Sequence, residues 1–132
     1  MANQTFDSAQ YKEYMAQLKR MISELPPFCA EFFRGIENET LIRTRVAYAG
    51  DLKNFFGFLI KENENFKRDN IRSLTLSDID RVSVTDVEIY LSYVTMYVDD
   101  DEREKVNQDR AKARKLSSIR ALYKYFYKKE KL

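Results

Sequence analysis

Residues 109–126, DRAKARKLSSIRALYKYF, form the stretch of sequence that decides the fold. At about 3.6 residues per turn, its apolar side chains fall on one face of a helix. That face consists of Leu116, Ile119, Leu122, Tyr123 and Phe126. The opposite face is cationic with small side chains at its centre, and it consists of Arg110, Arg114, Ser117, Ala121, Lys124 and Lys128. The stretch therefore predicts an amphipathic helix that packs on a core and exposes a basic outer face.

The outer face of this helix suits the major groove of DNA. Its cations neutralise phosphates, while Ser117 and Ala121 allow the backbone to approach base edges. Charge is concentrated in the same region, because residues 105–132 hold ten Lys and Arg against two Asp and Glu, whereas the whole chain has a net charge of +2. The alternative is a solvated amphipathic helix, and the basic face alone does not decide between the two.

The length and composition of the chain predict one helical domain in the cytoplasm. With 132 residues, 44% of them apolar, the chain is able to bury a core. Its single cysteine, Cys29, cannot form an internal disulfide and lies among apolar residues, which indicates a buried thiol in a reducing compartment. No apolar run approaches the roughly 18 residues of a membrane span, and the N-terminus has no signal-peptide pattern. We therefore expect a cytoplasmic protein that does not bind a membrane.

The absence of certain residue types limits the chemistry. The chain contains no histidine, which excludes Ser-His-Asp and Cys-His catalysis and the common imidazole metal sites. Its three glycines are isolated, so there is no glycine-rich phosphate loop. The acidic run at residues 99–104 lacks the spacing and the central glycine of a calcium loop and predicts a solvated loop instead. We therefore expect no catalytic residue, metal, cofactor or small-molecule substrate in this chain.

Apolar residues at helical spacing recur along the rest of the chain and predict an all-α fold. The expected helices are residues 8–24, 28–36, 41–63 and 84–98, with a short helical turn from Thr75 and the basic helix after the acidic loop. Pro26 and Pro27 separate the first two helices, because proline ends one helix and can begin the next. Ser83 begins a capping box with Asp86 three residues later. The helix that follows is expected to bury Val84, Val87, Leu91, Val94 and Val98.

The helix expected at residues 41–63 has two glycines on its outer face. Its core stripe consists of Leu41, Tyr48, Leu52, Phe55 and Leu59. Gly50 and Gly57 lie opposite, and each costs about 1 kcal/mol relative to alanine in a helix interior. That cost suggests that something approaches the backbone there. DNA and a closely packed first helix are both consistent with the pattern.

Two of these helices resemble the core-binding domain of tyrosine recombinases, the phage-integrase and Xer-like family. Residues 44–59, TRVAYAGDLKNFFGFL, match the pattern T-x3-Y-x2-D-L-x2-F-x2-F-L. Residues 114–123, RKLSSIRALY, match the pattern R-x-L-S-x-[LI]-R-x-[LF]-Y. Between them, LSDID at residues 76–80 and VEIYL at residues 87–91 occur in the order that the family shows. The resemblance covers residues 26–129.

The resemblance implies a SAM-like, four-helix core-binding domain at residues 26–132 that clamps duplex DNA. Residues 1–25 would be an N-terminal helical extension, which packs on the bundle or contacts a neighbouring subunit. In the family a catalytic domain follows, whose tyrosine cleaves and rejoins DNA through a phosphotyrosine intermediate. The resemblance implies that this chain lacks that domain and only positions DNA, so that its nine tyrosines are not nucleophiles. It also implies self-association on DNA in the full-length protein.

The resemblance also selects the side chains expected to contact DNA. At the start of the helix at residues 41–63 they are Arg43, Thr44 and Arg45. In the basic helix they are Arg110, Arg114, Lys115, Ser117, Arg120 and Lys124. Most are expected to bind phosphates, with Ser117 or Arg114 reaching base edges. The alternatives are plain solubilising charge for each cation, a bridge from Arg120 to an acidic neighbour, and a structural role for Thr44.

The sequence departs from the family pattern before the basic helix. Gln108 and Ala111 replace a serine and a threonine, so the helix cap is expected to move to Asp109. The acidic loop at residues 99–104 is longer than the usual connection. A rival interpretation is a helical protein-interaction module without DNA function, in which the basic helix and the acidic loop pair across subunits. A third is a stand-alone regulator that occupies recombination sites without cutting them.

Overall fold

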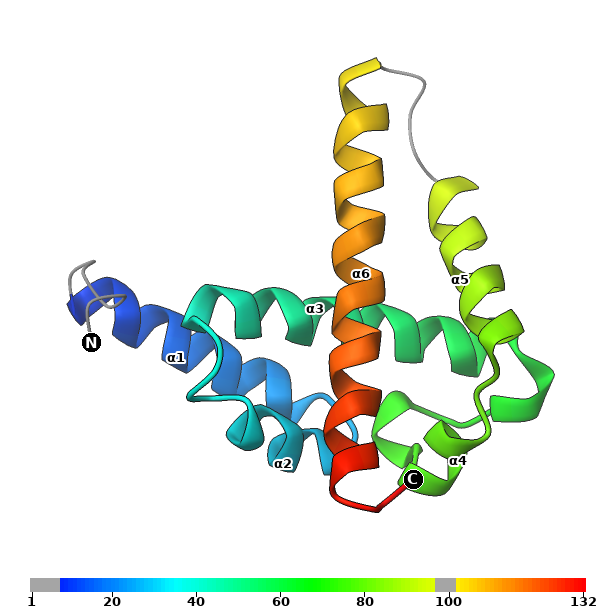
Figure 1. Cartoon of the computed structure of the whole chain (residues 1–132), viewed down its shortest axis with the longest axis horizontal. Coiled ribbons are helices and arrows are strands. Elements are labelled where there is room, and N and C mark those ends of the chain that lie inside the picture. The colour runs from blue at the N-terminus through cyan, green and yellow to red at the C-terminus, as the bar shows by residue number, and fades with distance from the viewer. Residues whose placement is uncertain (1–7, 97–101) are drawn as a thin grey trace.

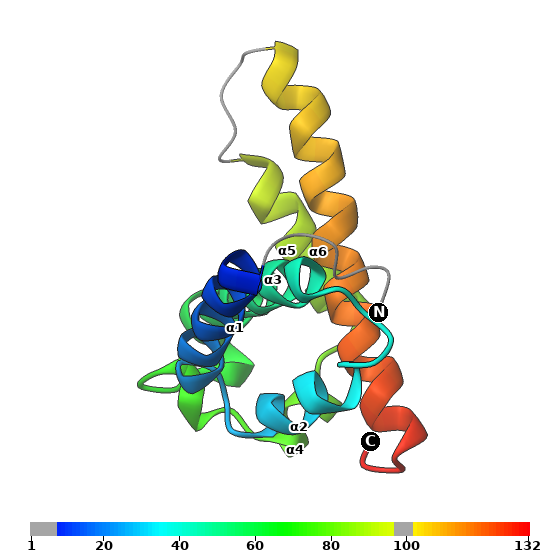
Figure 2. The ribbon, with the colours of Figure 1, turned by 90° about the vertical axis from the view of Figure 1, so that its left-hand side faces the viewer.

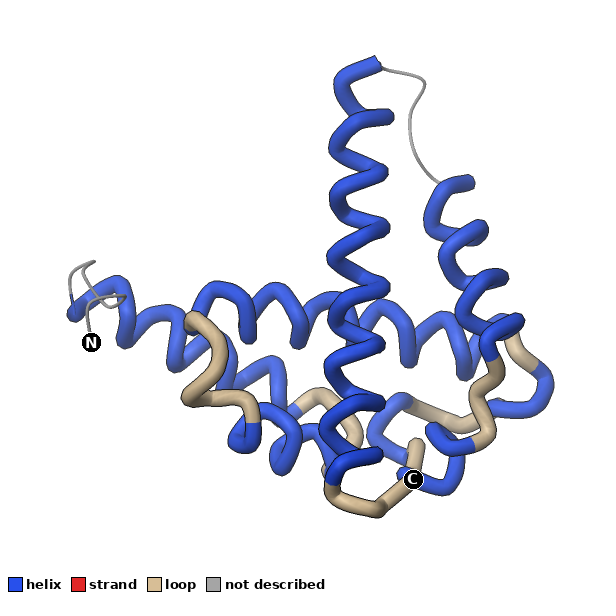
Figure 3. The backbone as a smooth tube through the Cα atoms, in the orientation of Figure 1, coloured by secondary structure: helices blue, strands red, loops and turns tan. Residues whose placement is uncertain are grey.

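The computed structural model describes residues 8–96 and 102–132, and this part of the chain contains helices and no strand (Figure 1, Figure 3). Its α-helices are α1 Ser8–Ser23, α2 Phe28–Gly35, α3 Ile42–Glu62, α4 Leu76–Asp80, α5 Val84–Met96 and α6 Glu102–Lys128. Two short 3₁₀ helices, η1 Glu64–Phe66 and η2 Ile71–Ser73, connect α3 to α4. The predicted all-α fold is confirmed, and most predicted helix ends lie within two residues of the observed ones.

Helix α3 lies at the centre of the molecule, and the other helices are arranged around it. Helix α1 runs alongside α3, while α6 crosses α3 and continues beyond it on the side where α5 also rises (Figure 1). Helices α2 and α4 lie on the opposite side of α3, near the C-terminal part of α6 (Figure 2). The crossing of α3 and α6 therefore determines which of their outer side chains become neighbours.

Aromatic side chains from α2, α3 and α5 form much of the core. Phe28 packs edge-to-face on Phe56 with ring centroids 6.0 Å apart, and Phe55 packs in the same way on Tyr90 at 5.0 Å. Such aromatic pairs contribute about 0.5–1.5 kcal/mol each beyond the burial of their area. Leu18 of α1 is buried in the same core, so α1 packs on the bundle.

The apolar face predicted for the basic helix packs on this core, as expected. Ile119, Leu122 and Phe126 are buried, and Leu116 and Tyr123 are half-buried. The residues predicted for the opposite face are exposed, apart from the half-buried Ala121. The helix therefore holds its basic face outward by burying its apolar one.

The buried residues of α5 differ from the prediction. The capping box at Ser83 is confirmed, since the Ser83 and Asp86 side chains each accept the other's backbone N–H, at 3.0 and 2.9 Å. Val84, which was predicted to be buried, directly follows the N-cap and points toward solvent, with 76% of its surface exposed. Tyr90 fills the core in its place, and its hydroxyl donates to Asn54 Oδ1 at 2.6 Å. Val87, Leu91 and Val94 are half-buried against the core, and Val98 lies outside the described residues.

The ends of two other predicted elements are also corrected. Helix α6 begins at Glu102, so the acidic run is helical from that residue and Asp109 lies inside the helix instead of capping it. Residues 99–101 of the predicted acidic loop lie outside the described residues. Leu41, predicted to lie in the core, is the N-cap of α3 and is 40% exposed, because the helix begins only after it.

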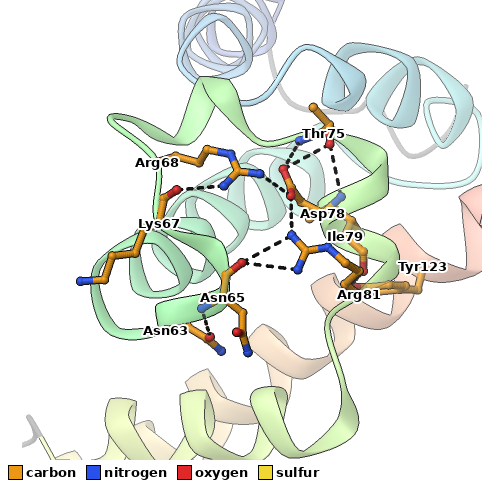
Figure 4. Close-up of polar contacts among 9 residues, drawn as sticks. All are labelled: Asn63, Asn65, Lys67, Arg68, Thr75, Asp78, Ile79, Arg81 and Tyr123. Atoms are coloured by element: carbon orange, nitrogen blue, oxygen red, sulfur yellow. Dashed lines mark hydrogen bonds and ion pairs between the residues drawn. The ribbon is translucent and has the colours of Figure 1, made fainter.

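A buried carboxylate joins α4 to the preceding loop (Figure 4). Asp78 is only 4% exposed, and its Oδ1 accepts from Arg68 at 2.6 Å and from Arg81 at 2.7 Å. Its Oδ2 accepts from the Thr75 backbone at 3.0 Å, and Thr75 Oγ1 accepts from the Asp78 backbone, which completes a capping box. Burial by itself raises the pKa of Asp78, but the bonds from Thr75, Arg81 and Arg68 outweigh burial and hold the pKa below its ordinary value of 3.8.

The glycines of the chain have different structural roles. A Cβ atom at Gly35 would lie 2.1 Å from Cε1 of Tyr125, so any larger residue there requires the Tyr125 ring of α6 to move. A Cβ atom at Gly50 would meet Met21 of α1 at an ordinary 3.5 Å, and one at Gly57 would meet nothing within 4 Å. Close packing of α1 therefore does not explain either glycine of α3.

Replacing Gly35 and Gly57 tests this difference. We expect Gly35→Ala to lower the free energy of unfolding by about 1–3 kcal/mol, because Tyr125 must move. Gly57→Ala is the matched control and should raise it by up to about 1 kcal/mol through helix propensity. Chemical denaturation measures both. Equal effects of the two substitutions would contradict the packing described for Gly35.

Asp78 should make stability depend on pH. A carboxyl whose pKa is lower in the folded than in the unfolded state stabilises the fold above its unfolded pKa, and that stabilisation is lost as pH falls through the folded pKa. Between about pH 5 and about pH 2, the free energy of unfolding should therefore fall more steeply for the wild type than for Asp78→Asn. Urea unfolding at several pH values measures the slopes. Parallel curves would show that Asp78 has no such role.

Candidate nucleic-acid interface

A hollow of about 460 Å³ lies where the start of α3 meets the middle of α6. Its lining residues are Arg43, Thr44, Ala47, Tyr48, Arg114 and Ser117. Four of these were predicted to contact DNA, two from each helix, although the pairs are about 70 positions apart in the sequence. The helix crossing therefore brings together predicted contact residues that the sequence keeps apart.

A second hollow, also of about 460 Å³, continues along α6 toward its C-terminal end. Lys124 and Lys128 line it from α6, Lys129 lines it just beyond the end of that helix, and Tyr48 lines both hollows. We call the two hollows together the basic groove and define it by Arg43, Thr44, Tyr48, Arg114, Ser117, Lys124 and Lys128; one acidic residue, Glu39, also lines the second hollow. Cationic side chains together with three hydroxyl groups form the type of surface that holds the phosphates of a nucleic acid.

Arg114 is a cation of the groove that is held in place by an ion pair with a buried carboxylate. Its Nε donates to Asp51 Oδ2 and its Nη2 donates to Asp51 Oδ1, both at 2.8 Å. This bidentate pair joins α6 to α3, and its hydrogen bonds raise the pKa of the Arg114 guanidinium. Lys115 Nζ lies 3.3 Å from Oδ1 of the same carboxylate, and the Lys115 side chain is only 16% exposed. Lys115 was predicted to contact DNA, but the structure places its ammonium group at Asp51.

Arg45 does not contribute to the groove. It is 3% exposed, and its Nη1 donates to the carbonyl oxygens of Glu37 and Thr40, both at 2.7 Å. The guanidinium thus satisfies carbonyl groups in the turn before α3 that accept from no backbone N–H of the described residues. We therefore leave Arg45 out of the candidate interface as a correction to the sequence-based set.

The remaining predicted contacts lie on the exposed side of α6. Arg110, Arg120 and Lys124 are exposed, and Lys124 lines the groove. Among the described residues, Arg120 forms no ion pair, so the suggested bridge to an acidic neighbour is not observed. Arg110 and Arg120 flank the groove without lining either hollow.

Three residues of the site were not on the predicted list. Tyr48 was assigned to the core stripe of its helix, but it is half-buried and lines both hollows. Lys128 lies on the predicted basic face, so helical spacing alone would have added it. Asp51 occurs in the first family pattern, but its negative charge does not suggest a place in a DNA-binding site. A carboxylate on the buried side of an apolar helix is a signal that a cation from another element must reach it.

Other kinds of site find no support in the described part of the chain. It holds no cluster of acidic, cysteine or histidine side chains able to bind a metal, and none of its helices is long and apolar enough to cross a membrane. Cys29 is buried, and its burial raises the pKa of the thiol, which makes it a structural residue.

Comparison with known proteins gives one informative match. Tyrosine recombinase XerC of Caldanaerobacter subterraneus subsp. tengcongensis is 36% identical to this chain over 92 residues. The match covers 65% of this chain and 24% of that protein, so the chain spans about a quarter of the length of the relative. No protein-family model and no solved structure matches the chain. The similarity therefore relates part of this chain to part of a tyrosine recombinase.

The structural role assigned to Arg45 is open to a direct test. Arg45→Ala should lower the free energy of unfolding by about 1–3 kcal/mol, because it leaves buried carbonyl groups without a donor. Arg120→Ala removes the same charge from an exposed position and should change stability by no more than about 0.5 kcal/mol. Thermal and chemical unfolding measure both variants. Equal stability of Arg45→Ala and the wild type would return Arg45 to the candidate interface.

Proposed function

We propose that this chain is the non-catalytic, DNA-binding core-binding domain of a site-specific tyrosine recombinase. The observation that carries the proposal is the meeting of Arg43 and Thr44 of α3 with Arg114 and Ser117 of α6 around one hollow. The partial similarity to a tyrosine recombinase gives independent support. Catalysis would then belong to another part of the full-length protein, which cleaves and rejoins DNA held by this domain.

The shape and chemistry of α6 suit a DNA groove. An α-helix is about 10–12 Å across and the major groove is about 12 Å wide, so one helix fills it. On the exposed surface of α6, Lys124 and Lys128 are placed to bind phosphates at one edge of the DNA major groove. The small side chains of Ser117 and Ala121 allow the helix backbone to approach the bases closely. Arg114 and Ser117 are the proposed contacts to base edges.

The environment of two tyrosines supports a non-catalytic role. Burial raises the pKa values of Tyr90 and Tyr123. Their hydroxyls donate to Asn54 and to the carbonyl of Ile79. A tyrosine that attacks phosphate must expose its oxygen and lose its proton readily, whereas these two do neither. Self-association on DNA and a cytoplasmic location are parts of the proposal that follow from the recombinase comparison alone.

DNA binding and its salt dependence test this function. A domain with roughly five phosphate contacts should bind a short random-sequence duplex with a log–log salt slope of about −4 to −5. Lys124→Ala should weaken binding and reduce the slope by about one, and Lys12→Ala on α1 removes the same charge outside the groove and should change neither. Fluorescence anisotropy at several salt concentrations measures both quantities.

Two results would contradict the proposal. Absence of binding at low salt, combined with self-association in analytical ultracentrifugation, would favour the protein-interaction module. Equal losses in Lys124→Ala and Lys12→Ala would show that the chain attracts DNA only through its overall charge.

A further inference from the structure

We infer that Asp51 is a positioning residue, which holds the guanidinium of Arg114 in the orientation that contacts DNA. This inference rests on the proposed function and deepens it, because it identifies a residue that acts on DNA through another side chain. It also assigns a binding role to a carboxylate that simple charge counting would place among residues unfavourable for DNA.

The geometry of the pair leaves one edge of the guanidinium available. Nε and Nη2 of Arg114 are both used by Asp51, at 2.8 Å each. Nη1 forms no hydrogen bond with the described residues. A bidentate pair fixes the plane of the guanidinium, so the position of Nη1 is set before any ligand arrives.

Burial differs sharply between the two partners. The Asp51 side chain is 2% exposed and lies on the buried side of α3. The Arg114 side chain is 50% exposed and lines the hollow together with Thr44 and Ser117. A free arginine at a surface samples many rotamers and loses that freedom when it binds. Because Asp51 restricts Arg114 in the unbound protein, less freedom is lost on DNA, and affinity rises.

Lys115 makes the carboxylate compatible with a DNA-binding surface. Its ammonium group lies 3.3 Å from Asp51 Oδ1, so the three side chains together carry a net charge of +1. Replacing Asp51 by asparagine raises that charge to +2. Charge attraction alone then predicts tighter DNA binding, whereas loss of positioning predicts weaker binding. The two explanations therefore predict effects of opposite sign.

The experiment compares DNA affinity in Asp51→Asn and Asp78→Asn, using a short random-sequence duplex at one low salt concentration. Both substitutions remove one negative charge from a buried, ion-paired carboxylate, but Asp78 lies away from the groove. We expect Asp51→Asn to weaken binding about threefold to tenfold, and Asp78→Asn to leave it unchanged or slightly stronger. Affinity of Asp51→Asn equal to or above that of the wild type would overturn the inference.

Two further variants keep the test decisive if Asp51→Asn folds poorly. Arg114→Lys keeps the net charge but cannot form the bidentate pair, and it should also bind about threefold to tenfold more weakly. In the Arg114→Ala background, Asp51→Asn should cause no additional loss, because there is no guanidinium left to position. Wild-type affinity of Arg114→Lys, or an equal loss from Asp51→Asn in both backgrounds, would overturn the positioning role.

The outcome for the wild type separates this inference from the proposed function. If the wild type does not bind DNA at low salt, the proposed function fails and the positioning role fails with it. If the wild type binds and only the expected effects of Asp51→Asn and Arg114→Lys are missing, the proposed function stands and the positioning role alone is overturned.

Discussion

The carboxylate of Asp51 sets the constraint on which the candidate interface depends. It is 2% exposed in a helix whose neighbouring side chains are largely aromatic and aliphatic, and a buried charge without a partner is strongly destabilising. Arg114 and Lys115 are adjacent in α6, and both reach it. Their contact fixes where α6 crosses α3. The same contact brings Ser117 next to Thr44 and so creates the hollow between the two helices.

A second buried carboxylate performs a similar structural task at the other end of the core. Asp78 holds Arg68 and Arg81 together and caps α4, while Tyr123 of α6 donates to the carbonyl of Ile79 in the same short helix. Asp51 thus binds α6 directly, whereas the segment held by Asp78 contacts α6 through the hydrogen bond from Tyr123 to Ile79. Of the two carboxylates, Asp51 is the one beside the basic groove, and it is the one for which we infer a role in binding.

The sequence predicted the long helices well because their apolar residues repeat at helical spacing over many turns. It failed where single residues depend on tertiary neighbours. Tyr90 follows the helical pattern and is buried against Asn54 and Phe55, whereas Val84, which was predicted to lie in the core, is exposed. Arg45 fitted the basic set, but the carbonyl groups of the preceding turn bind its guanidinium. Periodicity identified the basic face of α6, whereas the crossing that completes the groove required a pairing with Asp51 that sequence spacing cannot reveal.

The central claim is that DNA is bound where α3 crosses α6, and NMR mapping of the interface tests it most directly. Backbone amide signals of the isotopically labelled chain would be followed during titration with a duplex. The account predicts that shifts concentrate at residues 43–48 and 110–128, including Thr44 and Ser117, with α1 and α4 largely unaffected. Shifts centred on α1 or α4, or no shifts at low salt, would contradict it.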